Sequence, residues 1–292
     1  MNEFAQVALN GLVAGSVYAL VALGFALSFG VMRKVNFAHG ATCVVGGFTG
    51  YFFVVRLSAP LWAAVVGVLC VGAALGLVVE RVAFRPFRRT PPLLAIVSSL
   101  ALAMIIENVL AAVFGEQSRS FRPGVAERLV IPLLGISLTT VQLLIIGVAF
   151  LVAAIMYFVV TKTDLGRQTI AVSDDAEAAI TWGINGRQVV SAAFMLSSAV
   201  AAIAGCLVSF DLGIDPHMGT ELLFRAFTAS VIFGIGSLPG AFLGGLLLGL
   251  TENFVTAFVS SQYKSAWTFV VLIILLLFKP HGILNLHTRR FS

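Results

Sequence analysis

Long runs of apolar residues, separated by short stretches that carry most of the charges, set the pattern of this 292-residue chain. Most of the runs reach the roughly 20 residues that a helix needs to cross a bilayer. They lie at 8–31, 35–55, 61–79, 93–114, 139–160, 188–210, 224–236, 241–259 and 266–278. The pattern predicts an all-α fold, a polytopic transmembrane helical bundle with about nine crossings (eight to ten).

A glycine-rich break separates the seventh run from the eighth. Gly234, Gly236 and Pro239 lie in the sequence Gly-Ile-Gly-Ser-Leu-Pro-Gly, which is unfavourable for a continuous helix. We therefore expect an interrupted or re-entrant helix pair near 224–259. Such breaks persist at membrane depth only where protein buries them or where they line a cavity. These three residues are therefore candidates for a translocation pathway.

The basic residues fall unevenly on the two sides of the predicted bundle. Lysines and arginines near membrane spans tend to stay in the cytoplasm. Twelve of the 18 fall on one side, namely Arg33, Lys34, Arg81, Arg85, Arg88, Arg89, Lys162, Arg167, Arg187, Lys279, Arg289 and Arg290. The other side has Arg56, Arg119, Arg122, Arg128, Arg225 and Lys264. This bias predicts that the N-terminus is outside and the C-terminus is cytoplasmic, which requires an odd number of crossings.

The composition narrows the class of protein further. With 59% apolar and 11% charged residues, the chain is far from the roughly 25% charged residues of soluble domains, so a soluble globule is excluded. The formal charge of +5 fits retained cytoplasmic loops, and we expect the lipid bilayer and no nucleic acid as a partner. The first residues lack a basic stretch, so the first run is expected to be a permanent span.

Motifs of catalysis and metal binding are not found in the sequence. None of the four lysines follows the glycine pattern of a phosphate-binding loop, and the cysteines and histidines lack ligand spacing. We therefore predict no catalytic residues, no cofactor, no metal site and no ATPase site of the chain's own. A membrane enzyme built on His39 or His217 is kept as an alternative.

A few polar side chains within the apolar runs are candidates for function, since charge is costly in a bilayer. Glu107 and Glu252 lie in the fourth and eighth runs, and either could couple ions in a secondary transporter or channel that works alone. Asn36 and His39 open the second run, where they are either pathway residues or a helix cap with an interfacial imidazole. We assign Glu252, Asn36 and His39 to the candidate pathway.

The segment 164–187 predicts one short helix in a cytoplasmic loop. Ser173 or Asp174 can cap its start, and Gly183 can end it. Its first turn is acidic and its interior is rich in alanine, through Asp174, Asp175, Ala176, Glu177, Ala178 and Ala179. A helix of ten residues is marginal alone in water.

That short helix also carries an apolar patch. Ile180, Trp182 and Ile184 form a face that a solvated loop would not need, so we expect a partner to bury it. The acidic first turn makes a cytoplasmic protein a better partner than an anionic membrane surface.

Six short segments, in one order along nearly the whole chain, carry a family resemblance. They are Asn36-Phe37-Ala38-His39-Gly40, Glu80-Arg81-Val82-Ala83-Phe84-Arg85-Pro86, Gly183-Ile184-Asn185 with Arg187 and Val189 nearby, Ala226-Phe227-Thr228-Ala229, Gly234 to Ala241, and Gly282-Ile283-Leu284. Their order and spacing resemble the inner-membrane permease subunit of branched-chain amino-acid ABC transporters, the LivH type.

The resemblance implies a single permease transmembrane domain over 1–292, with a coupling loop at 161–187. It implies import of branched-chain amino acids, or a related small polar solute, across a bacterial inner (plasma) membrane. The implied partners are a second related permease subunit, two cytoplasmic ABC ATPases and a periplasmic solute-binding protein. The coupling residues toward the ATPase would be Ser173, Asp174, Asp175, Glu177, Ala178, Trp182, Gly183 and Asn185.

The sequence departs from the family pattern at three positions. Phe233 and Asn285 stand where the family commonly has glycine, and Trp182 stands where it commonly has leucine. A bulky Phe233 beside the break could reshape the pathway. Urea, short-chain amides and carboxylates, which relatives also carry, are therefore kept as alternative substrates.

Overall fold

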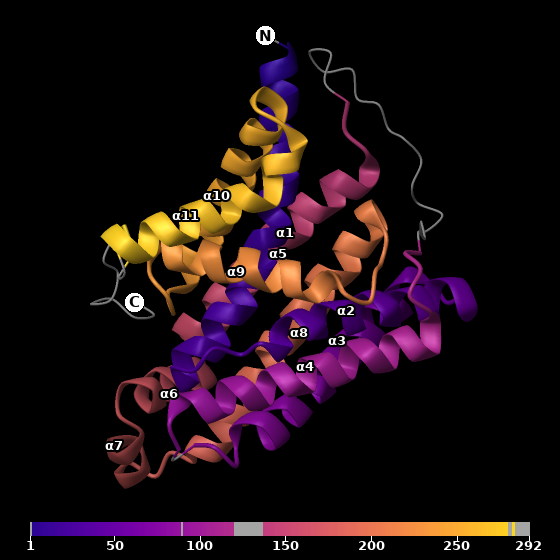
Figure 1. Ribbon diagram of the computed structural model, residues 1–292. Coiled ribbons are helices and arrows are strands. Elements are labelled where there is room, and N and C mark those ends of the chain that lie inside the picture. The colour runs from indigo at the N-terminus through magenta and orange to yellow at the C-terminus, as the bar shows by residue number, and fades with distance from the viewer. Residues whose placement is uncertain (1, 89, 120–136, 280–281, 284–292) are drawn as a thin grey trace.

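The computed structural model describes residues 2–88, 90–119, 137–279 and 282–283, and these are helical apart from connections and one isolated bridge between Arg119 and Ile214 (Figure 1). The helices are α1 (Asn2–Met32), α2 (Ala38–Tyr51), α3 (Leu61–Val79), α4 (Pro92–Phe114), α5 (Thr140–Lys162), α6 (Asp164–Asp174), α7 (Ala176–Thr181), α8 (Gly186–Leu212), α9 (Met218–Phe233), α10 (Leu238–Phe258) and α11 (Lys264–Phe278). π-helical turns, Phe52–Arg56 and Glu80–Phe84, extend α2 and α3, and a 3-10 turn, Ser261–Tyr263, precedes α11. The all-α prediction is confirmed.

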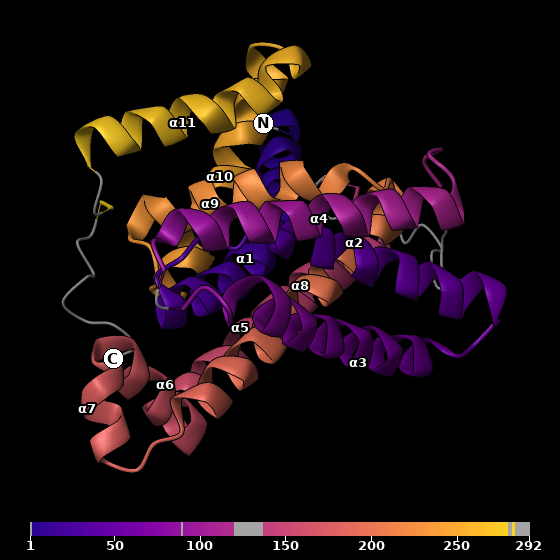
Figure 2. The same cartoon turned by 60° about the horizontal axis from the view of Figure 1, so that its bottom comes forward.

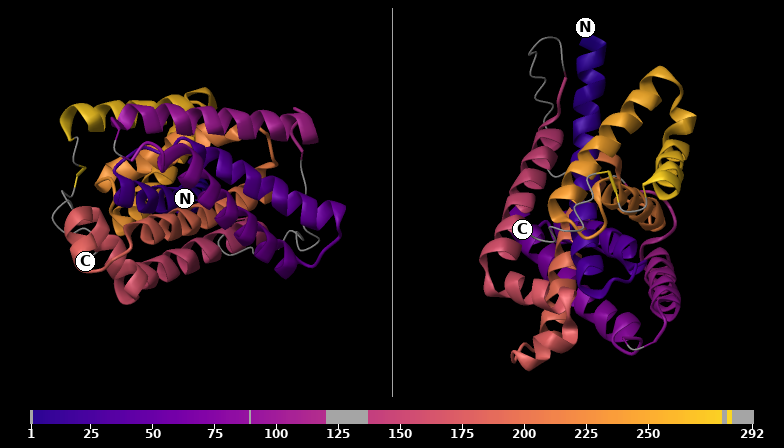
Figure 3. Two further views of the ribbon diagram at one scale, coloured as in Figure 1. Left: turned by 90° about the horizontal axis from the view of Figure 1, so that it is seen from below. Right: turned by 90° about the vertical axis from the view of Figure 1, so that its left-hand side faces the viewer.

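Two long helices form the centre of the bundle. In the most apolar stretch of α1, 83% of the residues are buried inside the protein, and in α8 the share is 78%, whereas in α4 and α11 it is 17%. A helix that is apolar on all sides needs protein or lipid around it. Figure 2 and Figure 3 show α3, α4 and α11 at the periphery, so their apolar outer faces are available to lipid or to other subunits.

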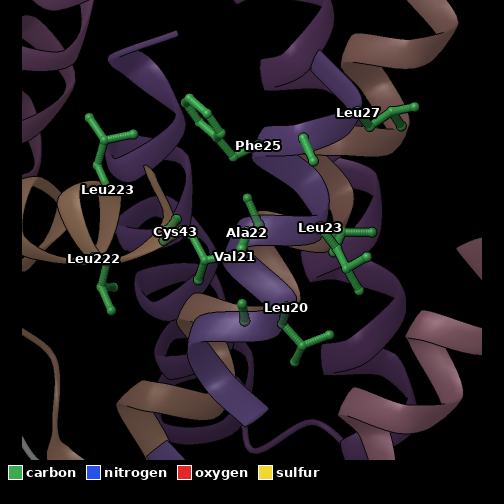
Figure 4. Packing of buried hydrophobic residues seen from close by; sticks show 14 of the residues in the cluster. Leu20, Val21, Ala22, Leu23, Phe25, Leu27, Cys43, Leu222 and Leu223 are labelled. Atoms are coloured by element: carbon green, nitrogen blue, oxygen red, sulfur yellow. The ribbon is translucent and has the colours of Figure 1, made fainter. Parts of the chain in front are cut away.

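The core is built around the middle of α1. Leu20, Phe25 and Leu27 are all buried there, and Figure 4 shows them with side chains that reach the same cluster from α2 and α9, such as Cys43 and Leu222. Because α1 is packed closely against several helices along its length, a displacement of one end of α1 would also shift the packing contacts along the rest of the helix.

Glycines allow the central helices to approach closely. A Cβ atom added to Gly249 of α10 would collide with the backbone of Gly15 in α1, and one on Gly205 of α8 would collide with Cys43 in α2. In lipid, small residues at such contacts replace the missing hydrophobic force with close van der Waals packing. Glycines therefore set the close approach of α10 to α1 and of α8 to α2.

The number of crossings lies within the expected range. Eight described helices are long and apolar enough to cross a membrane, and α9, with 16 residues, falls short of the roughly 20 that a crossing needs. The expected pair near 224–259 is present as α9 and α10, joined by residues 234–237. The seventh run, 224–236, was thus counted as a crossing on a helix that is only a partial span.

Three connections meet at one end of the bundle, which we call the inner end. The Arg33 guanidinium donates to the Ser173 carbonyl at 2.9 Å, and the Lys34 ammonium donates to the Phe87 carbonyl at 2.6 Å. Burial lowers the pKa of Lys34. At the other end, Arg119 and Ile214 exchange backbone hydrogen bonds. The grouping of connections that was derived from the charge bias is therefore reproduced in space.

One basic residue of that tally lies elsewhere. Arg225 was counted on the outer side at the start of the seventh run, and the structure places it well inside α9, which begins at Met218, where its side chain is largely buried. Several other residues of the tally and of the resemblance lie outside the described residues, namely Arg89, Arg122, Arg128, Leu284, Asn285, Arg289 and Arg290.

Candidate functional site

The loop between α5 and α8 forms two helices rather than one. The side chain of Thr163 accepts from the Gly166 amide at 3.3 Å and caps α6. The chain then turns at Asp175, whose carboxylate accepts from the amides of Glu177 and Ala178 at 2.9 and 3.0 Å and caps α7. Gly183, at φ +78°, follows the end of α7 as expected.

The expected start of the loop helix at Ser173 or Asp174 is wrong. Both residues belong to the last turn of α6, and the backbone becomes extended only at Asp175 (φ −150°, ψ 104°). Ser, Asp and a second Asp are chemically equivalent caps, so side-chain type alone does not select among neighbours. Asn185, placed in the coupling set, caps α8 by accepting from the Arg187 and Gln188 amides.

The exposed face of α7 is apolar. Ala179 packs inward, whereas Ile180 is exposed and Trp182 is 85% exposed. A six-residue helix has little stability of its own, and a large exposed tryptophan on it is typical of a surface that a partner covers. In Figure 1, α7 projects beyond the other helices at the lower left. Ile180 and Trp182 of the predicted apolar patch are therefore exposed, whereas its third residue, Ile184, is half-buried and packs against the core.

Ser173 points away from that surface and toward the centre of the bundle. Its hydroxyl donates to the Gly30 carbonyl near the end of α1 at 2.5 Å, while its own carbonyl accepts from Arg33 at 2.9 Å. We call Gly30, Arg33 and Ser173 the inner junction. Arg33 has φ +50°, a left-handed conformation that is uncommon for a residue with a side chain. These two hydrogen bonds connect α6 directly to α1.

The break between α9 and α10 lies beside the inner junction. Gly234 and Gly236 have φ values of +115° and +92°, which residues with a Cβ atom rarely adopt. A Cβ atom on Gly236 would lie 3.7 Å from the Cα atom of Gly30. The Ser237 side chain caps α10, and Pro239 occupies its first turn.

Asn36 and His39 lie between α1 and α2 and are buried. The side-chain oxygen of Asn36 accepts from the Ala38 amide at 3.0 Å, as a helix cap does. His39 is not the interfacial imidazole that was considered, because its Nε2 lies 3.0 Å from the Val21 carbonyl oxygen deep in the bundle. In the described part of the chain, Asn36 Nδ2 and His39 Nδ1 find no hydrogen-bond partner.

The two carboxylates that the sequence singled out within the spans, Glu107 and Glu252, each lie close to a basic side chain. Glu252 is fully buried on α10, and its Oε1 lies 3.2 Å from Nη2 of Arg225 on α9, although the angle is poor for a hydrogen bond. Glu221, which is more exposed, lies 2.6 Å from the same guanidinium. Glu107 on α4 lies 3.8 Å from Nδ1 of His217, which precedes α9. These contacts tie α9 to its neighbours.

The residues of the candidate pathway therefore do not form one site. Asn36 and His39 lie between α1 and α2, Gly234, Gly236 and Pro239 lie at the α9–α10 break, and Glu252 lies in the ion cluster with Arg225. The sequence did not identify Arg33 as a hydrogen-bond donor to the loop or Arg225 as a partner of Glu252. The four-residue spacing of Glu221 and Arg225 predicts their own pair, but no spacing in the sequence joins Arg225 to Glu252 on the next helix.

Comparisons with known proteins agree in pointing to one family. The family described as "Branched-chain amino acid transport system / permease component" matches residues 7–278. The chain is 33% identical to the high-affinity branched-chain amino acid transport system permease protein LivH of Escherichia coli, over 97% of this chain and 96% of that protein. It is also 33% identical to the permease protein BraD of Pseudomonas aeruginosa, with the same coverage. The ribose import permease protein RbsC of Bacillus subtilis is 26% identical over 95% of this chain and 83% of its own.

Proposed function

This chain belongs to the family of permease components of branched-chain amino acid transport systems, and we propose that it forms half of the membrane path of an ATP-driven importer. In this proposal a second related permease subunit completes the path, two cytoplasmic ABC ATPases supply the energy, and a periplasmic solute-binding protein delivers the solute. The proposed solutes are branched-chain amino acids, which are named for the transport systems of the relatives. The membrane is the bacterial inner membrane, with the N-terminus outside and the inner end in the cytoplasm.

The exposed apolar face of α7 is the observation that carries the proposal. A permease without an ATPase site of its own needs a surface on which a partner that hydrolyses ATP can act. Trp182 and Ile180 offer such a surface at the tip of the segment 161–187. Large aromatic side chains of this kind, once buried by a partner, are common hot spots of protein interfaces.

The inner junction supplies a route from that surface to the membrane core. In the proposal, closure of the ATPases displaces α7 and α6, and the hydrogen bonds of Ser173 carry the displacement to α1. The α9–α10 break beside Gly30 can absorb a change in helix direction, since its glycines permit backbone conformations that other residues avoid. Two states, biased by ATP and by the binding protein, are sufficient.

The test compares two exposed tryptophans. Trp182→Ala removes the anchor on α7, and Trp62→Ala removes an equally exposed tryptophan at the start of α3, far from α7. We expect Trp182→Ala to weaken the association with the ATPase subunits about 30-fold, as the loss of roughly 2 kcal/mol at an interface hot spot would. ATP-dependent uptake of labelled leucine into proteoliposomes should fall in parallel, and Trp62→Ala should change neither quantity.

The same assay separates the alternatives. If Trp182→Ala binds the ATPases and transports as Trp62→Ala does, the coupling role of α7 is wrong. If the complete complex imports urea or a carboxylate with ATP but no branched-chain amino acid, the assigned solute is wrong while the class of transporter stands.

A further inference from the structure

One side of the bundle exposes polar groups between two apolar helices. Figure 1 shows α4, α9 and α11 on the side that faces the viewer, and the right-hand view of Figure 3 shows the same three helices along one side. The flanking helices α4 and α11 expose large apolar side chains, such as Ile105 and Ile273. Between them, the start of α9 exposes Thr220 and Glu221. We call this side, formed by α4, α9 and α11, the mixed side.

Contacts between the three helices join the polar groups of the mixed side into one patch. The Ser265 hydroxyl of α11 donates to Oε1 of Glu221 on α9 at 3.0 Å. Nδ1 of His217, which precedes α9, lies 3.8 Å from Oε2 of Glu107 on α4. The side chains of His217 and Glu221 are 54% and 52% exposed. We call Glu107, His217, Thr220, Glu221 and Ser265 the polar patch.

The polar patch lies within the depth of the bilayer. Glu107 lies about two helical turns before α4 ends at Phe114, which is roughly 10 Å along the helix axis. Because His217 lies beside Glu107, α9 also begins below the end of α4. Exposed polar and charged groups at this depth are costly against lipid and are found where protein or water covers them. Lipid is therefore a poor neighbour for the polar patch.

The α3–α5 side of the bundle has the opposite character. A hollow of about 270 Å³ lies there between α3, α5 and α8, lined by apolar side chains such as Leu61, Val68 and Leu144. No charged residue of the described chain lines this hollow. Figure 3 shows α5 across the bundle from α11. Lipid chains can cover this side without leaving a charge in hydrocarbon, so the two sides call for different neighbours.

We propose that the mixed side faces the second permease subunit and that the polar patch lines a water-filled path between the two subunits, while the α3–α5 side faces lipid. The apolar side chains of α4 and α11 pack against the partner and separate the path from lipid. Related subunits in a two-fold arrangement present equivalent faces to each other, so the partner contributes a similar surface. The proposal rests on the proposed function, which supplies the second subunit, and deepens it by assigning the face that this subunit covers.

The polar patch is connected to the elements that would move during transport. It lies at the start of α9, and the same helix ends at the α9–α10 break beside the inner junction. Arg225, one turn after Glu221, also lies 3.2 Å from Glu252 on α10. A displacement of the inner junction that turns α9 would therefore widen or narrow the path at the polar patch.

The first experiment measures whether water reaches the polar patch. Thr220→Cys and Val66→Cys are each placed in a chain whose three native cysteines are changed to alanine, and each chain is assembled into the complete transporter in proteoliposomes. Val66 is 52% exposed within the span of α3 and serves as the control on the other side. We expect a membrane-impermeant maleimide to label Thr220→Cys at least tenfold faster, because the reactive thiolate forms in water. Equally slow labelling of the two chains would overturn the proposal.

The second experiment identifies the neighbour of the mixed side. Phe269 of α11 is exposed, and its ring lies 5.3 Å from that of Phe224 on α9, so Phe269→Cys carries a benzophenone maleimide beside the polar patch. Val66→Cys carries the same reagent on the other side. After illumination, we expect Phe269→Cys to give a cross-linked product with the mass of two permease subunits and Val66→Cys to give none. A product from Val66→Cys alone, or from neither chain, would overturn the proposal.

Failure here and failure of the proposed function have different signatures. A complex that imports leucine with ATP but cross-links its second permease through Val66→Cys alone would refute the assigned face and leave the importer intact. A chain that takes up leucine without ATPases or a second permease would refute the proposed function, whatever the labelling of Thr220→Cys.

Discussion

The two ends of α1 use polar groups in opposite ways. At the inner junction, Ser173 and Arg33 make short hydrogen bonds to backbone carbonyls, and Ser173 is buried. At the other end, residues of five helices, among them Gln142, Asn253 and Lys264, border a pocket of about 260 Å³, which we call the outer pocket. A closed, hydrogen-bonded contact is suited to transmitting a displacement, whereas the lining of an open pocket changes when the helices around it move.

The largest loss of stability is expected at the contact between α1 and α10, because both ends of α1 depend on this packing. Gly249→Leu would drive a side chain into the backbone of Gly15, which cannot move without shifting α1. Overpacking against side chains usually costs about 1–3 kcal/mol, and a clash with the backbone of a neighbouring helix should cost more than that or than the loss of a single ion pair, because the two helices would have to separate. We expect most of the folded protein to be lost in detergent, as measured by thermal unfolding on a sizing column.

The matched control for that variant is Gly147→Leu. Gly147 lies on the exposed face of α5, and a Cβ atom added there would meet no atom within 4 Å. The control should unfold at the temperature of the natural chain. Equal yields for the two variants would show that the α1–α10 contact is not needed for the fold.

A smaller effect should be confined to the outer half of the bundle. Glu252→Leu leaves Arg225 without its buried partner, and breaking a buried ion pair costs about 3–5 kcal/mol. Glu221→Leu removes the exposed partner of the same arginine, for which about 0–1 kcal/mol is expected. Thermal unfolding of both variants should therefore rank them clearly, and similar stabilities would show that Glu252 does not stabilise the charge of Arg225.

The smallest change in stability should accompany a specific loss of coupling at the inner end. Ser173→Ala removes one neutral hydrogen bond between α6 and α1, worth about 1 kcal/mol. Ser16→Ala removes a hydroxyl that donates to the Leu12 carbonyl within α1 and links no second helix. We expect Ser173→Ala to lower the ATPase stimulation by the loaded binding protein about fivefold with assembly unchanged, while Ser16→Ala leaves stimulation intact. Equal stimulation in the two variants would remove the inner junction from the coupling route.

The sequence allowed the spans, the α9–α10 break, Gly183 and the apolar patch on α7 to be predicted, because each depends on residues that are close together in the chain. The hydrogen bond between Ser173 and Gly30 joins residues 143 positions apart, and the periodicity of apolar residues in the sequence does not predict such a contact. The start of α7 was misplaced since three adjacent residues are equally good caps, and only the extended backbone at Asp175 decides among them. Glu252 could be singled out as a buried charge, but its partner could not, because Arg225 lies on a different helix and no periodicity joins the two residues.

The most direct test of the account follows a signal from the inner end to the outer end. Ala14, which lines the outer pocket, is replaced by cysteine in a chain whose three native cysteines are changed to alanine. This chain is assembled into the complete transporter, and labelling with a membrane-impermeant maleimide from outside is timed without nucleotide and after trapping with ATP and vanadate. We expect trapping to change the labelling rate at least fivefold, and we expect the additional substitution Ser173→Ala to remove most of this change. A rate that is the same in both nucleotide states would contradict the claim that α7 and α1 connect the ATPases to the outer pocket.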